Sequence, residues 1–112
     1  LKLNIAINYG GRAEIVRAAR MLAQKAAAGE ITPEDIDENA FAAALYTHDL
    51  PDVDLLIRTS GEMRLSNFLL YQCAYAEMEF PTVLWPDFSL ADYHAALEAF
   101  AARDRRFGGR KQ

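Results

Sequence analysis

The sequence is poor in the residues that form disulfides and zinc sites. Cys73 is the only cysteine, which excludes a disulfide within the chain and gives no sign of an oxidising compartment, so a cytoplasmic protein is expected. Cys73, His48 and His94 lie far apart and lack the spacing of Cys/His metal ligands, which argues against a zinc centre. We expect both histidines at the surface or at the core boundary.

A surplus of positive charge and a long apolar run are also missing. Because 16 Asp and Glu residues outnumber 12 Lys and Arg residues, the net charge is −4, which disfavours binding to nucleic acid. No apolar run approaches the roughly 20 residues that span a bilayer, and the first residues do not resemble a secretory signal. The apolar fraction is 52% of 112 residues, which suits one small domain or part of one.

Alternating strand-like and helix-like segments predict an α/β fold, with a parallel sheet and flanking helices. Strands are expected at residues 1–7, 54–59 and 80–85, where apolar residues alternate or run continuously. Helices are expected at residues 12–28, about 33–47, 67–79 and 90–106, and the second could instead start at Asp37. Three strands are few for such a sheet, and the chain starts at Leu1 rather than Met, so we expect an N-terminal half with further strands to be missing.

The strongest chemical signal lies between Ile57 and Asn67. Arg58 is expected at the carboxyl end of the 54–59 strand, where ligands of open α/β sheets bind. Arg64 follows, and Ser66 is expected to cap the helix 67–79, whose N-terminal N–H groups and dipole favour anions. Since guanidinium groups hold phosphate oxygens in pairs, the pattern indicates an anion site. The alternative is that both arginines are solvated or paired with Glu62 and nearby acids.

Two further features each have two interpretations. The Gly10-Gly11 turn between the first strand and the first helix could cradle an anion or could simply be a tight connection. Glu77 would lie near the C-terminal end of the helix 67–79, where the helix dipole disfavours a carboxylate. Glu77 is therefore either a solvated residue of the last turn or the partner of a cation.

Several long motifs resemble the cis-prenyltransferase family, in particular its bacterial undecaprenyl diphosphate synthases. They are Asp54-Leu-Leu-Ile-Arg-Thr-Ser-Gly-Glu62, Arg64-Leu-Ser-Asn-Phe-Leu-Leu70, Ala74-Tyr-Ala-Glu77 and Val83-Leu-Trp-Pro-Asp-Phe88, with neighbouring blocks at 3–12 and 105–109. The resemblance covers nearly the whole chain. It implies that residues 1–112 are the C-terminal portion of a single cis-prenyltransferase domain.

The resemblance also implies an activity. The family condenses isopentenyl diphosphate onto an allylic diphosphate, here farnesyl diphosphate, with Mg²⁺ as cofactor. The product would be undecaprenyl diphosphate for the cell-wall lipid carriers of peptidoglycan synthesis. The implied partners are the two substrates and a second copy in a homodimer, with peripheral membrane contact through the product.

The same resemblance implies roles for individual residues. Arg58, Arg64 and Ser66 would be the catalytic residues that hold the diphosphate of isopentenyl diphosphate, and Glu77 would be the metal ligand. The full set implied to bind substrate is Arg58, Arg64, Ser66, Asn67, Arg106 and Gly108, of which the last two belong to a motif that completes the active site across a dimer. On the expected helix, Ser66 and Glu77 lie about 16 Å apart, so we expect Glu77 to act on the partner's site or after a rearrangement.

The chain departs from the family pattern in two ways. The N-terminal block Asp-Gly-Asn-Gly-Arg-Trp is absent, so the fragment alone is expected to be inactive. Met63 stands where His, Gln or Lys is usual, and Ser60 stands where Gly is usual, which affects the hydrogen bonding of the loop. An alternative function is a non-catalytic partner subunit or a diphosphate-binding module that lends the residues 106–108 to a catalytic chain.

Overall fold

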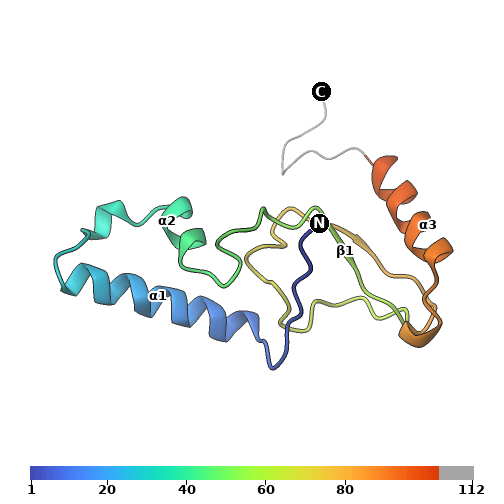
Figure 1. Ribbon diagram of the computed structural model, residues 1–112, viewed down its shortest axis with the longest axis horizontal. Helices are drawn as coiled ribbons and strands as arrows, with labels where there is room; N and C mark the ends of the chain where they lie inside the picture. Colours follow the sequence, from blue (N-terminus) through green and yellow to red (C-terminus); the bar gives the residue numbers. More distant parts are fainter. Residues whose placement is uncertain (104–112) are drawn as a thin grey trace. The chain divides into compact units, whose positions relative to one another are not determined.

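The computed structural model describes residues 1–103, which fall into two compact units. The first unit comprises residues 1–51 and 66–71, and its elements are α1 (Gly11–Ala27), the 3-10 helix η1 (Pro33–Asp35) and α2 (Glu38–Ala43) (Figure 1). The second unit comprises residues 52–65 and the chain from residue 72, and its elements are β1 (Leu55–Ile57), β2 (Glu77–Glu79), the 3-10 helix η2 (Trp85–Asp87) and α3 (Leu90–Ala101). Among these described residues, no helix is long and apolar enough to cross a membrane.

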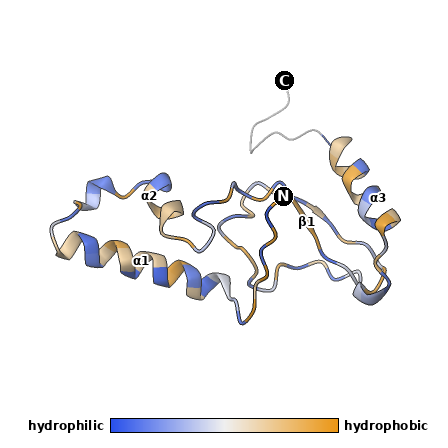
Figure 2. Cartoon of the chain, viewed as in Figure 1, coloured by the Kyte–Doolittle hydropathy of each residue, from blue (hydrophilic) through white to orange (hydrophobic). Residues whose placement is uncertain are grey.

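Helix α1 follows the Gly10-Gly11 turn, as predicted. Gly10 is the N-cap residue and has an extended backbone, with φ −145° and ψ 128°. After the helix ends, Gly29 has φ 76°, a left-handed conformation that glycine adopts without steric cost. Both ends agree with the predicted helix 12–28 to within one residue. Figure 2 shows hydrophobic and hydrophilic residues interspersed along α1, the pattern of a helix with one buried face.

The core of the first unit lies between α1 and α2, which pack against each other. Its buried residues are Ala18, Leu22, Ala44 and Leu45, and the partly buried Ile31, Phe41 and Tyr71 pack against them. The rings of Phe41 and Tyr71 have centroids 5.1 Å apart. Both predicted helix starts in this region are used, since Thr32 precedes η1 and Asp37 caps α2 by accepting a hydrogen bond from the Ala40 N–H.

The predicted strand at residues 1–7 is not formed. This segment has no regular secondary structure, and its large apolar residues Leu1, Leu3, Ile5 and Ile7 are at least 76% exposed. A strand needs a neighbour that accepts and donates its main-chain hydrogen bonds, and the alternating pattern buries one face only within a sheet. The alternating pattern is present in the sequence, but the described part of the chain provides no strand that pairs with residues 1–7.

The sheet of the second unit has two parallel strands, β1 and β2. The register pairs Leu55 with Glu77, Leu56 with Met78 and Ile57 with Glu79. Leu56 is 8% exposed, so the strand predicted at 54–59 forms at its centre and is buried there. Together with the flanking helices, the parallel pair confirms the predicted α/β class.

The predicted helix 67–79 is wrong. Ser66, Asn67 and Leu69 have φ values of 49°, 65° and 44°, which a right-handed helix with φ near −63° does not allow. The last residues of that range, Glu77–Glu79, instead form β2, because β1 requires a hydrogen-bonded neighbour. The strand predicted at 80–85 is wrong as well, since the ladder ends at Glu79 and η2 begins at Trp85.

Helix α3 begins as the sequence predicts. The Ser89 side chain accepts a hydrogen bond from the Asp92 N–H, and the Asp92 carboxylate accepts one from the Ser89 N–H at 2.8 Å, which is a capping box. The backbone and side-chain hydrogen bonds from Ser89 lower the pKa of Asp92 below its usual value. The helix ends at Ala101, within the range 90–106 that was predicted for it.

Candidate anion-binding site

The loop that carries the two arginines leaves the carboxyl end of β1 and is fixed by main-chain hydrogen bonds to the last residue of β2 and the segment after it. The N–H groups of Arg58, Ser60 and Gly61 donate to the carbonyl oxygens of residues 79, 83 and 81, at 2.8–2.9 Å. Ser60 and Gly61 have φ values of 67° and 65°, so the chain turns through two consecutive left-handed residues. The backbone around Arg58 is therefore held in place, independently of its side chain.

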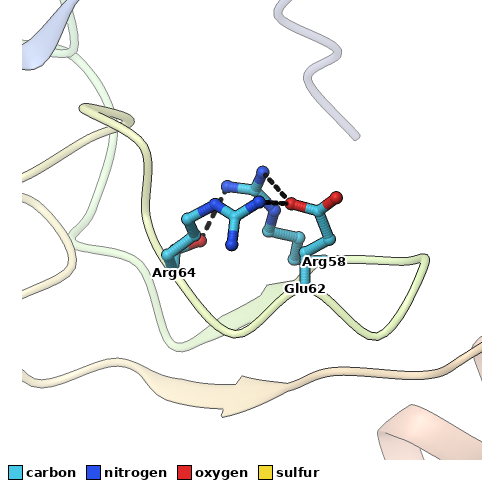
Figure 3. Close-up of polar contacts among 3 residues, drawn as sticks. All are labelled: Arg58, Glu62 and Arg64. Atoms are coloured by element: carbon cyan, nitrogen blue, oxygen red, sulfur yellow. Dashed lines mark hydrogen bonds and ion pairs between the residues drawn. The ribbon is translucent and has the colours of Figure 1, made fainter.

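Arg58 and Arg64 meet at one carboxylate oxygen (Figure 3). The Oε2 atom of Glu62 lies 3.4 Å from Nη2 of Arg58 and also forms an ion pair and hydrogen bond with Nη2 of Arg64. Nη1 of Arg58 donates to the main-chain oxygen of Arg64 at 2.7 Å. The structure thus confirms the alternative that the arginines pair with Glu62, and it also confirms that two guanidinium groups converge at this end of β1. We call Arg58, Glu62 and Arg64 the arginine cluster.

The arginine cluster carries one net positive charge and is open to solvent. The exposed fraction of the side chain is 30% for Arg58, 41% for Glu62 and 63% for Arg64. Ion pairs at this exposure are screened by water and are individually weak, about 0.2–1 kcal/mol. An anion that offers several oxygens can therefore reach both guanidinium groups.

Ser66 and Asn67 belong to the first unit, and their local structure differs from the prediction. With φ 49° and no helix after it, Ser66 is not an N-cap. Asn67 acts at the start of α1: its main-chain oxygen accepts from the Gly11 N–H at 2.7 Å, and its Oδ1 accepts from the Arg12 N–H at 2.8 Å. A Cβ at Gly10 would lie 2.9 Å from the Asn67 side-chain nitrogen. The Gly10-Gly11 turn therefore allows the close approach of Asn67, and two N–H groups that could have cradled an anion are occupied.

Glu77 has a cation partner, as one interpretation of the sequence proposed. Nη1 of Arg103 lies 3.1 Å from Glu77 Oε2 and donates to the Met78 main-chain oxygen at 2.9 Å, while Nη2 pairs with Glu79. The reason is not a helix dipole, because Glu77 begins β2. Residues two apart on a strand share one face, so a single guanidinium group can bind both carboxylates. The predicted separation of about 16 Å between Ser66 and Glu77 assumed one continuous helix, so it does not apply here.

The acidic residues of this unit match the oxygen ligands that Mg²⁺ prefers, although they do not form a closed metal site. Glu77 and Glu79 offer two carboxylates, and both pair with Arg103, whose single positive charge offsets one of their two negative charges. Within residues 1–103, no three acidic, His or Cys side chains gather around a common point. Mg²⁺ often uses only one or two protein carboxylates and takes its other ligands from substrate phosphates and water, so Glu77 suits such a site as one of several ligands.

The first unit contains an open cavity of about 390 Å³ that is mainly apolar. Its lining includes Ile5, Ile7, Tyr9, Leu50 and Phe68. These residues come from the N-terminal segment and from loops of the first unit. The cavity is within the size range of small-molecule sites, and its lining also includes the polar side chains of Asn4, Asn8 and Thr47.

Two of the predicted site residues, Arg106 and Gly108, lie outside the described residues. Sequence reasoning did not identify Arg103 as a site residue. It also missed the role of Asn67 as a cap for α1. An asparagine after a serine gives no local signal for a contact with a helix 55 residues earlier in the chain.

Comparison with known proteins gives consistent matches over almost the whole chain. Residues 1–108 match a family model described as "Putative undecaprenyl diphosphate synthase". The chain is 56% identical over 109 residues to ditrans,polycis-undecaprenyl-diphosphate synthase ((2E,6E)-farnesyl-diphosphate specific) of Escherichia coli strain K12. That match covers 97% of the chain and 43% of the relative, so the chain spans less than half the length of the curated relative.

Solved structures agree with these matches. Lavandulyl diphosphate synthase from Lavandula x intermedia, solved in complex with dimethylallyl diphosphate, superposes with a TM-score of 0.89 at 48% sequence identity. A structure titled as a probable undecaprenyl diphosphate synthase from Campylobacter jejuni superposes with a TM-score of 0.77 at 37% identity. Each match covers 92% of this chain and 44% or 45% of the other chain.

Proposed function

Since this chain belongs to the undecaprenyl diphosphate synthase family of prenyltransferases, we propose that it is the diphosphate-binding part of a cis-prenyltransferase. The proposed reaction condenses isopentenyl diphosphate onto an allylic diphosphate, farnesyl diphosphate, and yields undecaprenyl diphosphate for cell-wall lipid carriers. The chain would be the C-terminal portion of a single domain. Its share of the work is to bind the diphosphate of isopentenyl diphosphate.

The observation that carries this proposal is the convergence of Arg58 and Arg64 on one oxygen. A diphosphate has several oxygens that two guanidinium groups can grip together, and charge-assisted hydrogen bonds of this kind are about twice as strong as neutral ones. The site lies at the carboxyl end of β1, which is where ligands of α/β sheets usually bind. Fixed cations at this position would also stabilise the charge of a diphosphate in the transition state.

Mg²⁺ is part of the proposal, with Glu77 as one of its ligands. The ion supplies charge stabilisation for a departing diphosphate. Arg103 would then have a second task, because it pairs with Glu77 and Glu79 while no metal ion is bound. A solvent-exposed ion pair of this kind exchanges its partner at low cost.

The remaining parts of the proposal follow the family. We propose a homodimer in which residues 106–108 complete the partner's site, a location in the cytoplasm and peripheral contact with the membrane through the product. The allylic diphosphate would bind outside the arginine cluster. The lavandulyl diphosphate synthase structure, which contains dimethylallyl diphosphate, supports an allylic substrate for this family.

A chimera tests the proposed function. This chain would replace the matching 109 residues of the Escherichia coli relative, and incorporation of labelled isopentenyl diphosphate would be measured with farnesyl diphosphate and Mg²⁺. We expect an active chimera and an inactive isolated chain. Arg58→Ala should raise the KM for isopentenyl diphosphate by about 10- to 100-fold, because a hydrogen bond to a charged group is lost. Arg20→Ala, which removes an exposed arginine of α1, is the matched control and should leave the KM unchanged.

The same experiment separates the alternative function. A chimera that folds and binds inorganic pyrophosphate through Arg58, but forms no product, would favour a diphosphate-binding module or a non-catalytic partner subunit. An active chimera in which Arg58→Ala and Arg20→Ala behave alike would contradict the assignment of Arg58 to substrate binding.

A further inference from the structure

Glu62 occupies the place where an anionic ligand would bridge the two arginines. A single oxygen, Oε2, contacts both guanidinium groups, at 3.4 Å from Arg58 and in closer contact with Arg64. A phosphate oxygen in this position would accept the Nη2 N–H groups of both arginines, which now donate to Glu62 (Figure 3). The carboxylate and an external anion therefore exclude each other at this point.

We propose that Glu62 is a built-in competitor for the arginine cluster, so that a diphosphate must displace its carboxylate in order to bind. This inference rests on the proposed function in one respect, namely that the ligand is a diphosphate. It adds that the affinity of the site is set by an acidic side chain of the same loop. Removing the negative charge of Glu62 should strengthen binding of the ligand.

The loop geometry determines which part can move. The main chain from Arg58 to Gly61 is held by three hydrogen bonds to residues 79–83, so the backbone does not need to open. The Glu62 side chain is 41% exposed and can swing into water once its oxygen is replaced. Arg58 keeps its hydrogen bond to the Arg64 main-chain oxygen during this exchange, which holds its guanidinium group close to its present position.

The size of the effect follows from the exposure of the two ion pairs. The affinity lost to an internal competitor equals the free energy of the contacts that the ligand must break. For two exposed pairs this corresponds to about 2- to 30-fold in the dissociation constant. A carboxylate that only held the arginines together would act in the opposite direction, since its removal would let two like charges separate and would weaken binding.

Calorimetric titration with inorganic pyrophosphate, without Mg²⁺ and at constant ionic strength, tests the proposal on the full 112-residue chain. Glu62→Gln keeps the size of the side chain and removes its charge, and Glu62→Ala is a second variant with the same expected direction. Glu34→Gln is the matched control, because it removes one negative charge from an exposed residue of η1 in the other unit. Arg58→Ala shows whether the measured binding uses the arginine cluster. Far-UV circular dichroism verifies that each variant folds.

Tighter binding by both Glu62 variants, with Glu34→Gln close to the original chain, would support the competitor, and so would binding that appears only after Glu62 is replaced. Equal or weaker binding by the Glu62 variants would overturn the competitor. If that binding is still lost in Arg58→Ala, the proposed diphosphate site itself would stand. If no variant binds pyrophosphate, the arginine cluster is not an anion site, and both this inference and the proposed substrate binding fail. These three outcomes distinguish the competitor from the proposed function.

Discussion

Substitution of Asn67 tests whether this residue is a helix cap or a ligand contact. Its Oδ1 accepts from the Arg12 N–H, which is the second helical position of α1, and Gly10 has no side chain that could do so. Losing a capping side chain costs about 1 kcal/mol. Asn67 also has φ 65°, where a residue such as alanine adds about 1–2 kcal/mol of strain.

These two terms predict an ordered series of variants. Asn67→Ala loses the cap and adds strain, and should destabilise the chain by about 2 kcal/mol. Asn67→Gly loses the cap without strain and should cost about 1 kcal/mol. Asn67→Asp keeps an accepting oxygen near the positive end of the helix and should be close to neutral. The control Asn39→Ala removes an exposed amide from α2 and should stay within about 0.5 kcal/mol.

Urea unfolding followed by far-UV circular dichroism measures the series, and amide hydrogen exchange locates the effect. In the Ala and Gly variants, the Arg12 amide should lose protection, because its acceptor is gone. The Gly11 amide should lose less, since it donates to the main-chain oxygen of residue 67, which every variant retains. Unchanged protection of the Arg12 amide in Asn67→Ala would refute the capping role. If Asn67→Ala instead raised the Kd for pyrophosphate strongly without loss of stability, Asn67 would be a ligand contact, as the family resemblance implies.

Three further predictions concern single residues. Glu14 is 1% exposed and accepts a hydrogen bond from the Tyr46 N–H at 2.7 Å. Glu14→Ala should therefore lower the free energy of unfolding in urea by about 3 kcal/mol. Glu14→Gln can still accept that hydrogen bond and should lower it less. Ser60→Gly should raise stability by about 0.5 kcal/mol, because relief of its left-handed strain exceeds the extra entropy of the unfolded chain; a lower melting temperature would contradict this. The pKa of Asp92 is lowered in the folded chain. The Asp92 carboxylate therefore contributes fully to folding stability above the usual pKa of 3.8, and this contribution is lost as the pH falls through the lower pKa of the folded state. Asp92→Asn should therefore flatten the acid side of the stability profile, and an identical profile would argue against the capping box.

The elements that the sequence predicts well are those with a local signal at one or both ends. Helix α1 has the Gly10-Gly11 turn before it and Gly29 after it, and α3 has the Ser89 capping box. Strand β1 stands out as a continuous apolar run before a polar loop. In each case the residues that fix the boundary are neighbours in the sequence, so a reading of the chain alone can find them.

The segment from Ser66 to Glu79 shows what local patterns cannot predict. Its apolar residues are spaced as in a buried helix, yet β1 takes Glu77–Glu79 as its hydrogen-bonded neighbour, and Asn67 is bound to the start of α1. Both contacts join residues more than 20 positions apart. The strand prediction for residues 1–7 fails for the converse reason. The alternating pattern is present, but the segment has no regular structure because the described chain provides no strand beside it.

The candidate site divides in the same way. The convergence of Arg58 and Arg64 follows from their spacing across a short loop, and pairing with Glu62 was an alternative that the sequence already offered. The partnership of Glu77 with Arg103 could not be located, because it depends on where α3 ends relative to β2. A cation near Glu77 was expected because of the helix dipole, and this reason does not apply because Glu77 lies on a strand.

The charged groups of the second unit are paired in a way that is consistent with a binding role. The arginines that would hold a diphosphate share Glu62, and the carboxylate that would hold a cation shares Arg103 with its neighbour on β2. The side chains of these pairs are 22–63% exposed, so water screens the ion pairs. Exposed pairs contribute at most about 1 kcal/mol each, whereas hydrogen bonds between a phosphate and arginine contribute more. Each internal partner therefore keeps its group in place and offsets part of its charge, and a ligand of the same charge that binds more strongly can replace it.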